Sequence, residues 1–238
     1  MDGTMTDYAR LETLLTNALA LTRRPVAVTA RSTALPGVEP FTGSMPSGCS
    51  FWRLAAEGRT FSTVPSDHYN CPIGSHTHNI ALPAERAHEL MDALTLMTQV
   101  GYIRMEEVPS IPRLAASPAT VIYGPLGDTP VDPDAVVVSG VPARVMLLNE
   151  AATRAGVPLM PLLGRPTCMA IPASMGGAVV NSTGCIGNRV YTGVPDSEVY
   201  TMIAGRQLAT VVDALDDITK ANAALTDYHQ QRRATLTA

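Results

Sequence analysis

Four cysteines confined to two short segments constrain this chain more than any other feature. Each lies close to glycine, proline or serine, and no two are spaced as CxxC. That spacing argues against the tight knuckles of zinc ribbons and bacterial ferredoxins and against a thioredoxin-like motif. If the cysteines share one site, segments far apart in the sequence must meet in the fold. The cysteines are Cys49 and Cys71 in residues 45–74, and Cys168 and Cys185 in residues 166–189.

The expected cellular compartment decides how grouped cysteines are interpreted. Residues 1–15 include acidic side chains and lack the apolar run of a signal peptide, so we expect a cytoplasmic protein. Structural disulfides are rare in that reducing compartment. The cysteines are therefore predicted to bind a metal group or to act as reactive thiols.

The composition indicates a globular chain whose partner is a small molecule. Of the 238 residues, 46% are hydrophobic, which is enough for a substantial core. The formal net charge is -4 and the basic residues are scattered, so we expect neither nucleic acid nor an anionic membrane surface as a partner. No apolar stretch is long enough to span a bilayer.

Periodicity and turn residues predict a mixed α/β (α+β) fold. We expect one compact domain over residues 1–238, with a mixed sheet, flanking helices, long ordered loops that carry the cysteines, and a long C-terminal helix that permits a homodimer. The similar pieces NCPIG and GCIGN leave open a duplication of halves at about 1–115 and 116–238. The predicted helices cover 7–22, 84–98, 150–156 and a stretch from about 206, and the predicted strands cover 25–31, 119–125, 134–140 and 143–149.

The residues around the cysteines favour an iron-sulfur cluster. Such a cluster needs thiolate ligands and backbone N–H groups directed at its sulfurs, and glycine beside a cysteine lets the backbone approach closely. Zinc also accepts four thiolates and stays open as the alternative. The predicted ligands of a [4Fe-4S] cluster are Cys49, Cys71, Cys168 and Cys185, and the predicted cofactor-binding residues are Gly48, Asn70, Gly74, Gly184 and Gly187.

Three charged or titratable residues near the cysteines are candidate catalytic groups. His68 precedes Cys71 and could donate a proton or lie beside the cluster. Arg53 and Arg189 each lie four residues after a cysteine and could bind a carboxylate or phosphate. A hydrogen-bonding loop histidine and surface ion pairs are the structural alternatives.

Two further histidines and the single tryptophan allow two interpretations each. His76 and His78 have the spacing of a metal pair on one face of a strand, but an exposed polar turn is favoured because no third ligand is near. Trp52 is expected to anchor its segment to the core or to form the wall of a pocket.

The order of these motifs resembles the family called domain of unknown function 169, over nearly the whole chain. The motifs are RRPVAV, GCSFWRLAAEG, DHYNCPIG, PTCMAIP, GCIGNR and a closing amphipathic helix. The resemblance implies no reaction and no cofactor. It implies that the family pattern includes Cys49, Cys71, Cys168, Cys185, His68, Asn70, Gly74, Gly187 and Arg189.

Three function classes follow from these residues. The favoured class is an enzyme that uses a [4Fe-4S] cluster on a small anionic substrate, in Lewis-acid, sulfur-transfer or redox chemistry. The first alternative is a non-catalytic module in which zinc or a cluster holds distant segments of the chain together and senses redox state. The second is a metal-free thiol enzyme with one low-pKa cysteine. No P-loop, GxGxxG after a strand, GxSxG or HExxH motif is present.

Overall fold

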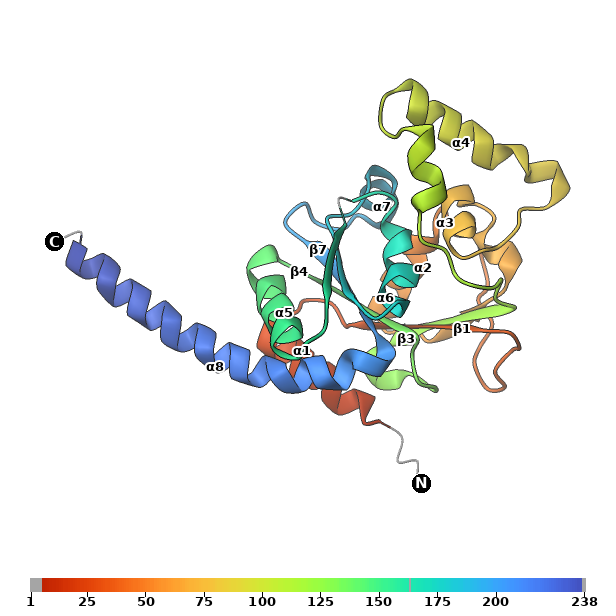
Figure 1. The fold of residues 1–238 in the computed structure, drawn as a ribbon. Coiled ribbons are helices and arrows are strands. Elements are labelled where there is room, and N and C mark those ends of the chain that lie inside the picture. Colours follow the sequence, from red (N-terminus) through yellow and green to blue (C-terminus); the bar gives the residue numbers. More distant parts are fainter. Residues whose placement is uncertain (1–5, 163, 237–238) are drawn as a thin grey trace.

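A seven-stranded mixed sheet runs through the centre of the computed structural model, which describes residues 6–162 and 164–236 (Figure 1). The strand order is β2-β3-β1-β4-β7-β6-β5, in which β5 and β6 are parallel and every other neighbouring pair is antiparallel. The strands are β1 (Val26–Arg31), β2 (Phe61–Thr63), β3 (Thr120–Pro125), β4 (Ala135–Gly140), β5 (Leu159–Leu162), β6 (Val179–Ser182) and β7 (Val199–Ala204).

The order of the strands joins the two halves of the chain in one domain. β1 comes from the first half and lies between β3 and β4 from the second half. The predicted mixed α/β fold in a single compact domain is thus confirmed for the described residues. Residues 1–5, 163 and 237–238 of the predicted domain lie outside them. The ancient duplication stays a prediction.

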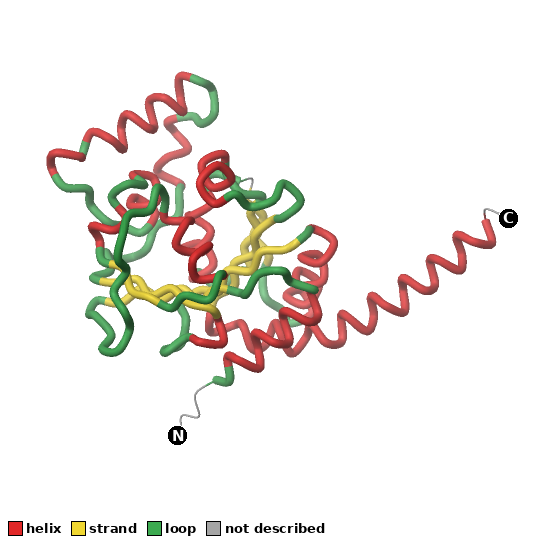
Figure 2. The backbone as a smooth tube through the Cα atoms, turned by 180° about the vertical axis from the view of Figure 1, so that it is seen from behind, coloured by secondary structure: helices red, strands yellow, loops and turns green. Residues whose placement is uncertain are grey.

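Helices cover both faces of the sheet. The α-helices are α1 (Tyr8–Leu19), α2 (Gly48–Ala56), α3 (Pro72–Thr77), α4 (His88–Gln99), α5 (Pro142–Arg154), α6 (Ala170–Met175), α7 (Ile186–Thr192) and α8 (Gly205–Leu236). Short 3-10 helices accompany them: η1 (Pro65–His68), η2 (Ala84–Arg86), η3 (Met105–Ser110), η4 (Leu126–Asp128) and η5 (Thr167–Met169). In Figure 1 and, from behind, in Figure 2, α1, α5 and α8 lie on one side of the sheet and α2 and α6 on the other.

Alternate side chains of each central strand enter two separate cores, because successive residues of a strand point to opposite faces. In β4, Val136 and Val138 pack with α1, α5 and α8, whereas Ala135 and Val137 pack with α2 and α6. The strand is therefore apolar at successive positions rather than at alternate ones. Cys49 and Cys168 belong to the core on the α2 and α6 side.

The strand predicted at 143–149 is wrong. These residues belong to α5, which begins with Pro142 at its first turn and extends through the short helix predicted at 150–156. The apolar run fits either element on its own, but Val145, Leu148 and Ala152 are buried at helical spacing. The other predicted helices and strands correspond to α1, α4, α8, β1, β3 and β4.

The segments that carry the cysteines are not simply long loops. They contain α2, η1, α3, η5, α6 and α7, and each of these elements is short. Cys49 lies in the first turn of α2, and the other three cysteines lie at or just before the start of a helix. The glycines and prolines that indicated loops instead begin and end these short helices.

Helix α8 packs on the sheet only through its first third. Its buried residues are Leu208, Val211, Val212 and Leu215, and the remainder projects away from the body (Figures 1 and 2). Leu225 and Tyr228 in this projecting part are more than half exposed. No helix in the described part of the chain is both long and apolar enough to cross a membrane.

We expect the projecting part of α8 to be dispensable for folding of the single chain. Ending the chain at Ile218 removes no buried side chain of α8, so the melting temperature should change by less than about 2 °C. Leu215→Ala removes a fully packed side chain and should lower it by at least about 4 °C. Thermal unfolding followed by circular dichroism checks both. If only the shortened chain lost stability, and did so in a concentration-dependent way, the first expectation would be contradicted. The projecting part of α8 would then be shown to hold a second chain.

Candidate functional site

Four cysteine-bearing elements meet on the α2 and α6 side of the sheet. Helix α2 contacts α3, α7 and η5, and α3 contacts η5, so the two cysteine segments lie together although far apart in sequence. All four cysteines are free thiols, and Cys49 and Cys168 are only 5% and 4% exposed. Cys71 and Cys185 are half-buried. The structure thus brings the four predicted ligands together.

The buried thiols strongly resist ionisation. Burial raises the pKa of Cys49 well above its usual value, and the charges that Cys168, Cys71 and Cys185 would carry raise it further. Burial also raises the pKa of Cys71 and of Cys168. A reactive catalytic thiol needs the opposite, a lowered pKa. These three thiols can become thiolates together only if a positive group balances their charge.

Backbone N–H groups nevertheless face one of the sulfurs. The N–H groups of Gly48 and Gly74 lie within hydrogen-bond reach of the Cys71 sulfur and lower the pKa of that thiol, against the larger effect of burial. A Cβ atom at Gly74 would lie 2.8 Å from the Cys71 Sγ, closer than packed atoms approach. Position 74 therefore has to be glycine if this backbone is to cradle the sulfur.

Asn188 supplies two more donors to the same group of thiols. Its backbone N–H donates to the Cys185 Sγ at 3.4 Å, because Cys185 is the N-cap of α7. Its side chain hydrogen-bonds Cys49 and lowers the pKa of that thiol in part. The side-chain amide also donates to the Tyr200 hydroxyl at 3.3 Å. Asn188 is buried, so it links two cysteines to the sheet.

Two buried histidines present ring nitrogens without partners in this region. The Thr63 hydroxyl donates to the Val121 carbonyl, so its oxygen accepts from His68 Nε2–H at 2.9 Å. His68 Nδ1 then carries a lone pair, has no partner among the described residues, and lies 4.0 Å from where a Cβ of Gly48 would be. Burial lowers the pKa of His68 to about 3.

His78 repeats this arrangement beside His68, with ring centroids 5.5 Å apart. His78 Nδ1 donates to the Gly74 carbonyl at 2.9 Å, and its Nε2 is buried without a partner among the described residues. The exposed polar turn predicted for His76 and His78 is thus wrong for His78, which is 1% exposed. Helix α3, absent from the prediction, turns this side chain inward.

Tyr123 on β3 is a further buried group that sequence reasoning missed. It packs against Phe51 and Phe61, and its hydroxyl has no hydrogen-bond partner among the described residues. Burial raises the pKa of Tyr123 well above its usual value, and the nearby thiols of Cys49, Cys168 and Cys71 raise it further. A phenol that faces three thiols is a hydrogen-bond donor for charge that forms on sulfur.

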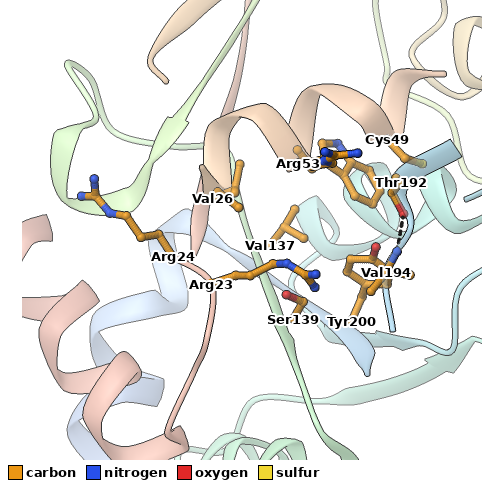
Figure 3. Close-up of a pocket in the computed structure, with 12 residues that line it drawn as sticks. Arg23, Arg24, Val26, Cys49, Arg53, Val137, Ser139, Thr192, Val194 and Tyr200 are labelled. Atoms are coloured by element: carbon orange, nitrogen blue, oxygen red, sulfur yellow. Dashed lines mark hydrogen bonds between the residues drawn. The ribbon is translucent and has the colours of Figure 1, made fainter. Parts of the chain in front are cut away.

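A pocket opens on one side of Cys49 (Figure 3). One face of α2 lines it with Cys49, Trp52 and Arg53, which follow one another at helical spacing. Trp52 is buried and its ring meets the Tyr200 ring edge to face, so it both anchors α2 and forms a pocket wall. The remaining lining residues are Arg23, Arg24, Val26, Ala56, Val137, Ser139, Thr192, Val194 and Tyr200.

Two other predicted site residues, Arg189 and Asn70, form hydrogen bonds that stabilise the fold and do not face the thiols. The Arg189 guanidinium donates to the carbonyls of Thr183, Pro195 and Glu198, and it does not line the pocket. The Asn70 amide donates to Ser44 and Met45.

The two remaining predicted glycines lie near the start of α7. Gly184 has a φ of +82°, which favours glycine, and a Cβ there would lie 3.0 Å from the Asn188 Oδ1. At Gly187 a Cβ would meet only ring atoms of Tyr191 at ordinary contact distance.

The described residues do not form a site for a single metal ion. Among them, no three of the His, Cys, Asp and Glu side chains are grouped closely enough to hold one. Zinc bonds sulfur at about 2.3 Å, so its thiolate ligands must lie within about 4 Å of one another. An iron-sulfur core is larger and separates its ligands more widely than a single ion does.

The family model of domain of unknown function 169, DUF169, described as an uncharacterised ArCR, matches residues 14–214. The chain belongs to this family. Comparison with curated proteins gives no match, and comparison with solved structures gives none. Membership of DUF169 confirms the resemblance seen in the sequence and brings no reaction with it. All four cysteines lie inside the matched residues.

We expect the buried histidines of this DUF169 chain to make it acid-sensitive. The unfolded chain binds protons on His68 and His78 below pH about 6.5, whereas the folded chain keeps His68 neutral down to about pH 3. The free energy of unfolding should therefore fall as pH falls below about 6.5, by up to about 1.4 kcal/mol per pH unit for each histidine.

Urea unfolding between pH 7 and pH 4 checks this expectation. His68→Gln should make the pH dependence shallower by about one proton. His88→Gln is the matched replacement of a surface histidine, because the His88 side chain is 67% exposed. Equal slopes in the parent and in His68→Gln would contradict the assignment of a neutral buried imidazole.

Proposed function

We propose that this protein binds an iron-sulfur cluster, [4Fe-4S], through Cys49, Cys71, Cys168 and Cys185, and that it is an enzyme for a small anionic substrate. The observation that carries the proposal is the convergence of four buried or half-buried thiols from two distant segments. The raised pKa values of Cys49, Cys71 and Cys168 make neighbouring thiolates unstable unless a cationic core balances them. We also propose that the protein is cytoplasmic, as expected from its sequence.

The donors around the thiols fit such a group. Gly48 and Gly74 present backbone N–H groups to Cys71, and Asn188 presents donors to Cys49 and Cys185. Hydrogen bonds to cysteine sulfur offset the negative charge of a thiolate-bound cluster. The buried Tyr123 hydroxyl adds a further donor beside three of the thiols.

When bound, the cluster would supply electron transfer or, with an open iron position, a Lewis acid or an acceptor of sulfur. The chain supplies the rest. His68 Nδ1 is a neutral hydrogen-bond acceptor that could orient a protonated group of the substrate, and the side chain is buried from solvent. Arg53 lines the pocket beside Cys49, and its exposed ion pair with Glu57 holds it weakly, so it is free to bind an anion. Arg189 has a structural role, because its guanidinium donates hydrogen bonds to three backbone carbonyls.

The alternatives have less support. A zinc module stapled by four cysteines requires sulfurs around one ion, and the described thiols are not so grouped. A metal-free thiol enzyme requires a thiol with a lowered pKa, and Cys49, Cys71 and Cys168 all have raised ones.

Metal analysis of protein purified without oxygen tests the proposal. We expect about four iron and four acid-labile sulfide per chain and a visible absorption band near 400 nm, on the order of what one cubane contributes. Each of Cys49→Ser, Cys71→Ser, Cys168→Ser and Cys185→Ser should reduce iron content. Zinc alone would establish the stapled module instead, and the absence of both metals from freshly purified, folded protein would refute metal binding.

A pair of glycine variants tests whether the backbone cradles Cys71. Gly74→Ala places a Cβ 2.8 Å from the Cys71 Sγ, so the sulfur must move, and we expect iron content to fall at least about tenfold. Gly187→Ala is the matched control, because its Cβ meets only the Tyr191 ring at 3.7 Å. Iron per folded chain is measured for both. Full iron content in Gly74→Ala would show that Cys71 is not a ligand.

A further inference from the structure

We infer that the pocket beside Cys49 binds a short aliphatic monocarboxylate, with the carboxylate on Arg23. This inference names the substrate class of the proposed enzyme. That the bound carboxylate is a substrate rests on the proposed function. The binding itself depends only on residues of this chain. Arg23 begins the motif RRPVAV, in which the sequence analysis names no candidate site residue.

The pocket has one polar side built by paired strands. Ser139 of β4 and Tyr200 of β7 are direct neighbours in the antiparallel register, and both line the pocket. The side chain of Arg23 points toward these two residues in Figure 3. Tyr200 is also close enough to Cys49 and Arg23 for both to influence the pKa of its hydroxyl. A ligand held by Arg23 would therefore lie near the Cys49 thiol.

The hydrogen-bond donors of the pocket suit an anion. Among the described residues, no acidic side chain lines it. Arg23 Nη1 forms an ion pair with the largely buried Glu198 carboxylate at 2.6 Å, which holds the guanidinium in place, and its Nε and Nη2 groups have no hydrogen-bond partner among the described residues. Because a guanidinium presents its N–H groups as a planar fork, the unused groups match the two oxygens of a carboxylate.

The other two arginines of the lining differ from Arg23. Arg24 points away from the pocket in Figure 3 and is held by Glu12 and Asp128. Arg53 pairs only with Glu57, and both side chains are more than half exposed, so this pair contributes little and Arg53 can turn to the ligand. Arg23 is thus the main anion-binding group and Arg53 an auxiliary one.

The size and the opposite wall of the pocket limit the ligand. Its volume is about 40 Å³, which is about three times what one water molecule needs. Val26 and Val137 are paired across β1 and β4 and, with Val194, form an apolar wall. A methyl or ethyl group fits this wall, whereas a phosphate would place oxygens against it without donors. The acetate or propionate class fits both sides.

Trp52 makes binding measurable without any assay of activity. It is the only tryptophan of the chain, it is buried, and it lines this pocket. A carboxylate that enters the pocket changes the surroundings of the indole. Intrinsic tryptophan fluorescence of the full-length protein therefore comes from one side chain, which lines this pocket.

The test is a fluorescence titration of the full-length protein with sodium acetate at constant ionic strength. We expect a saturable change with acetate and propionate, and none with acetamide, which is neutral. Arg23→Gln should raise the Kd for acetate at least tenfold. Arg154→Gln should leave it unchanged, because Arg154 pairs with Asp217 on α8 and does not line the pocket.

Three results would overturn the inference: no saturable change with acetate, an equal response to acetamide, or an unchanged Kd in Arg23→Gln. If Arg23→Gln does not fold, judged by circular dichroism, Ser139→Ala takes its place and should weaken acetate binding at least threefold. Iron content measured on the same samples separates the two proposals. Acetate binding without iron would leave the pocket assigned and refute the cluster, and iron without acetate binding would do the reverse.

Discussion

The burial of four thiols in one region is the constraint on which the rest of this structure depends. Thiols are apolar enough to be packed in a core, but thiolates that lie close together repel one another, and burial strengthens that repulsion. The raised pKa values of Cys49, Cys71 and Cys168 express both effects. The region is therefore stable in two forms only, as protonated thiols or as thiolates around a cationic group.

Buried polar groups lie near these thiols. The buried atoms His68 Nδ1, His78 Nε2 and the Tyr123 hydroxyl have no partner among the described residues. An unsatisfied buried polar group costs about 1–3 kcal/mol, and the whole stability of a domain is about 5–15 kcal/mol. Apolar side chains of similar shape would avoid this cost if the region were only a core. In the proposed iron-sulfur protein, a bound polar group would offset part of this cost.

The sequence predicted that the cysteines lie together better than it predicted the elements that carry them. The cysteines could be grouped from their glycine-rich surroundings, and α1, α4, α8, β1, β3 and β4 could be placed from periodicity. Strands β2, β5, β6 and β7 were missed. The first three have only three or four residues, and β7, with six, lies between the turn-forming residues 195–197 and Gly205. The run at 143–149 was misassigned, since a continuous apolar stretch fits a buried strand and a buried helix equally well.

The sequence did not reveal the proposed ligand-binding residues that the sheet places beside Cys49. Arg23, Ser139 and Tyr200 are separated from every cysteine by ten or more residues, and only the adjacency of β1, β4 and β7 places them beside Cys49. Helix α2 joins the two regions, because Cys49 faces the other thiols while it also lines the pocket with Trp52 and Arg53. A ligand on Arg23 and a metal group on the cysteines would then lie on either side of Cys49. A change in charge at one site would change the electrostatic potential at the other, because the region between them has a low dielectric constant.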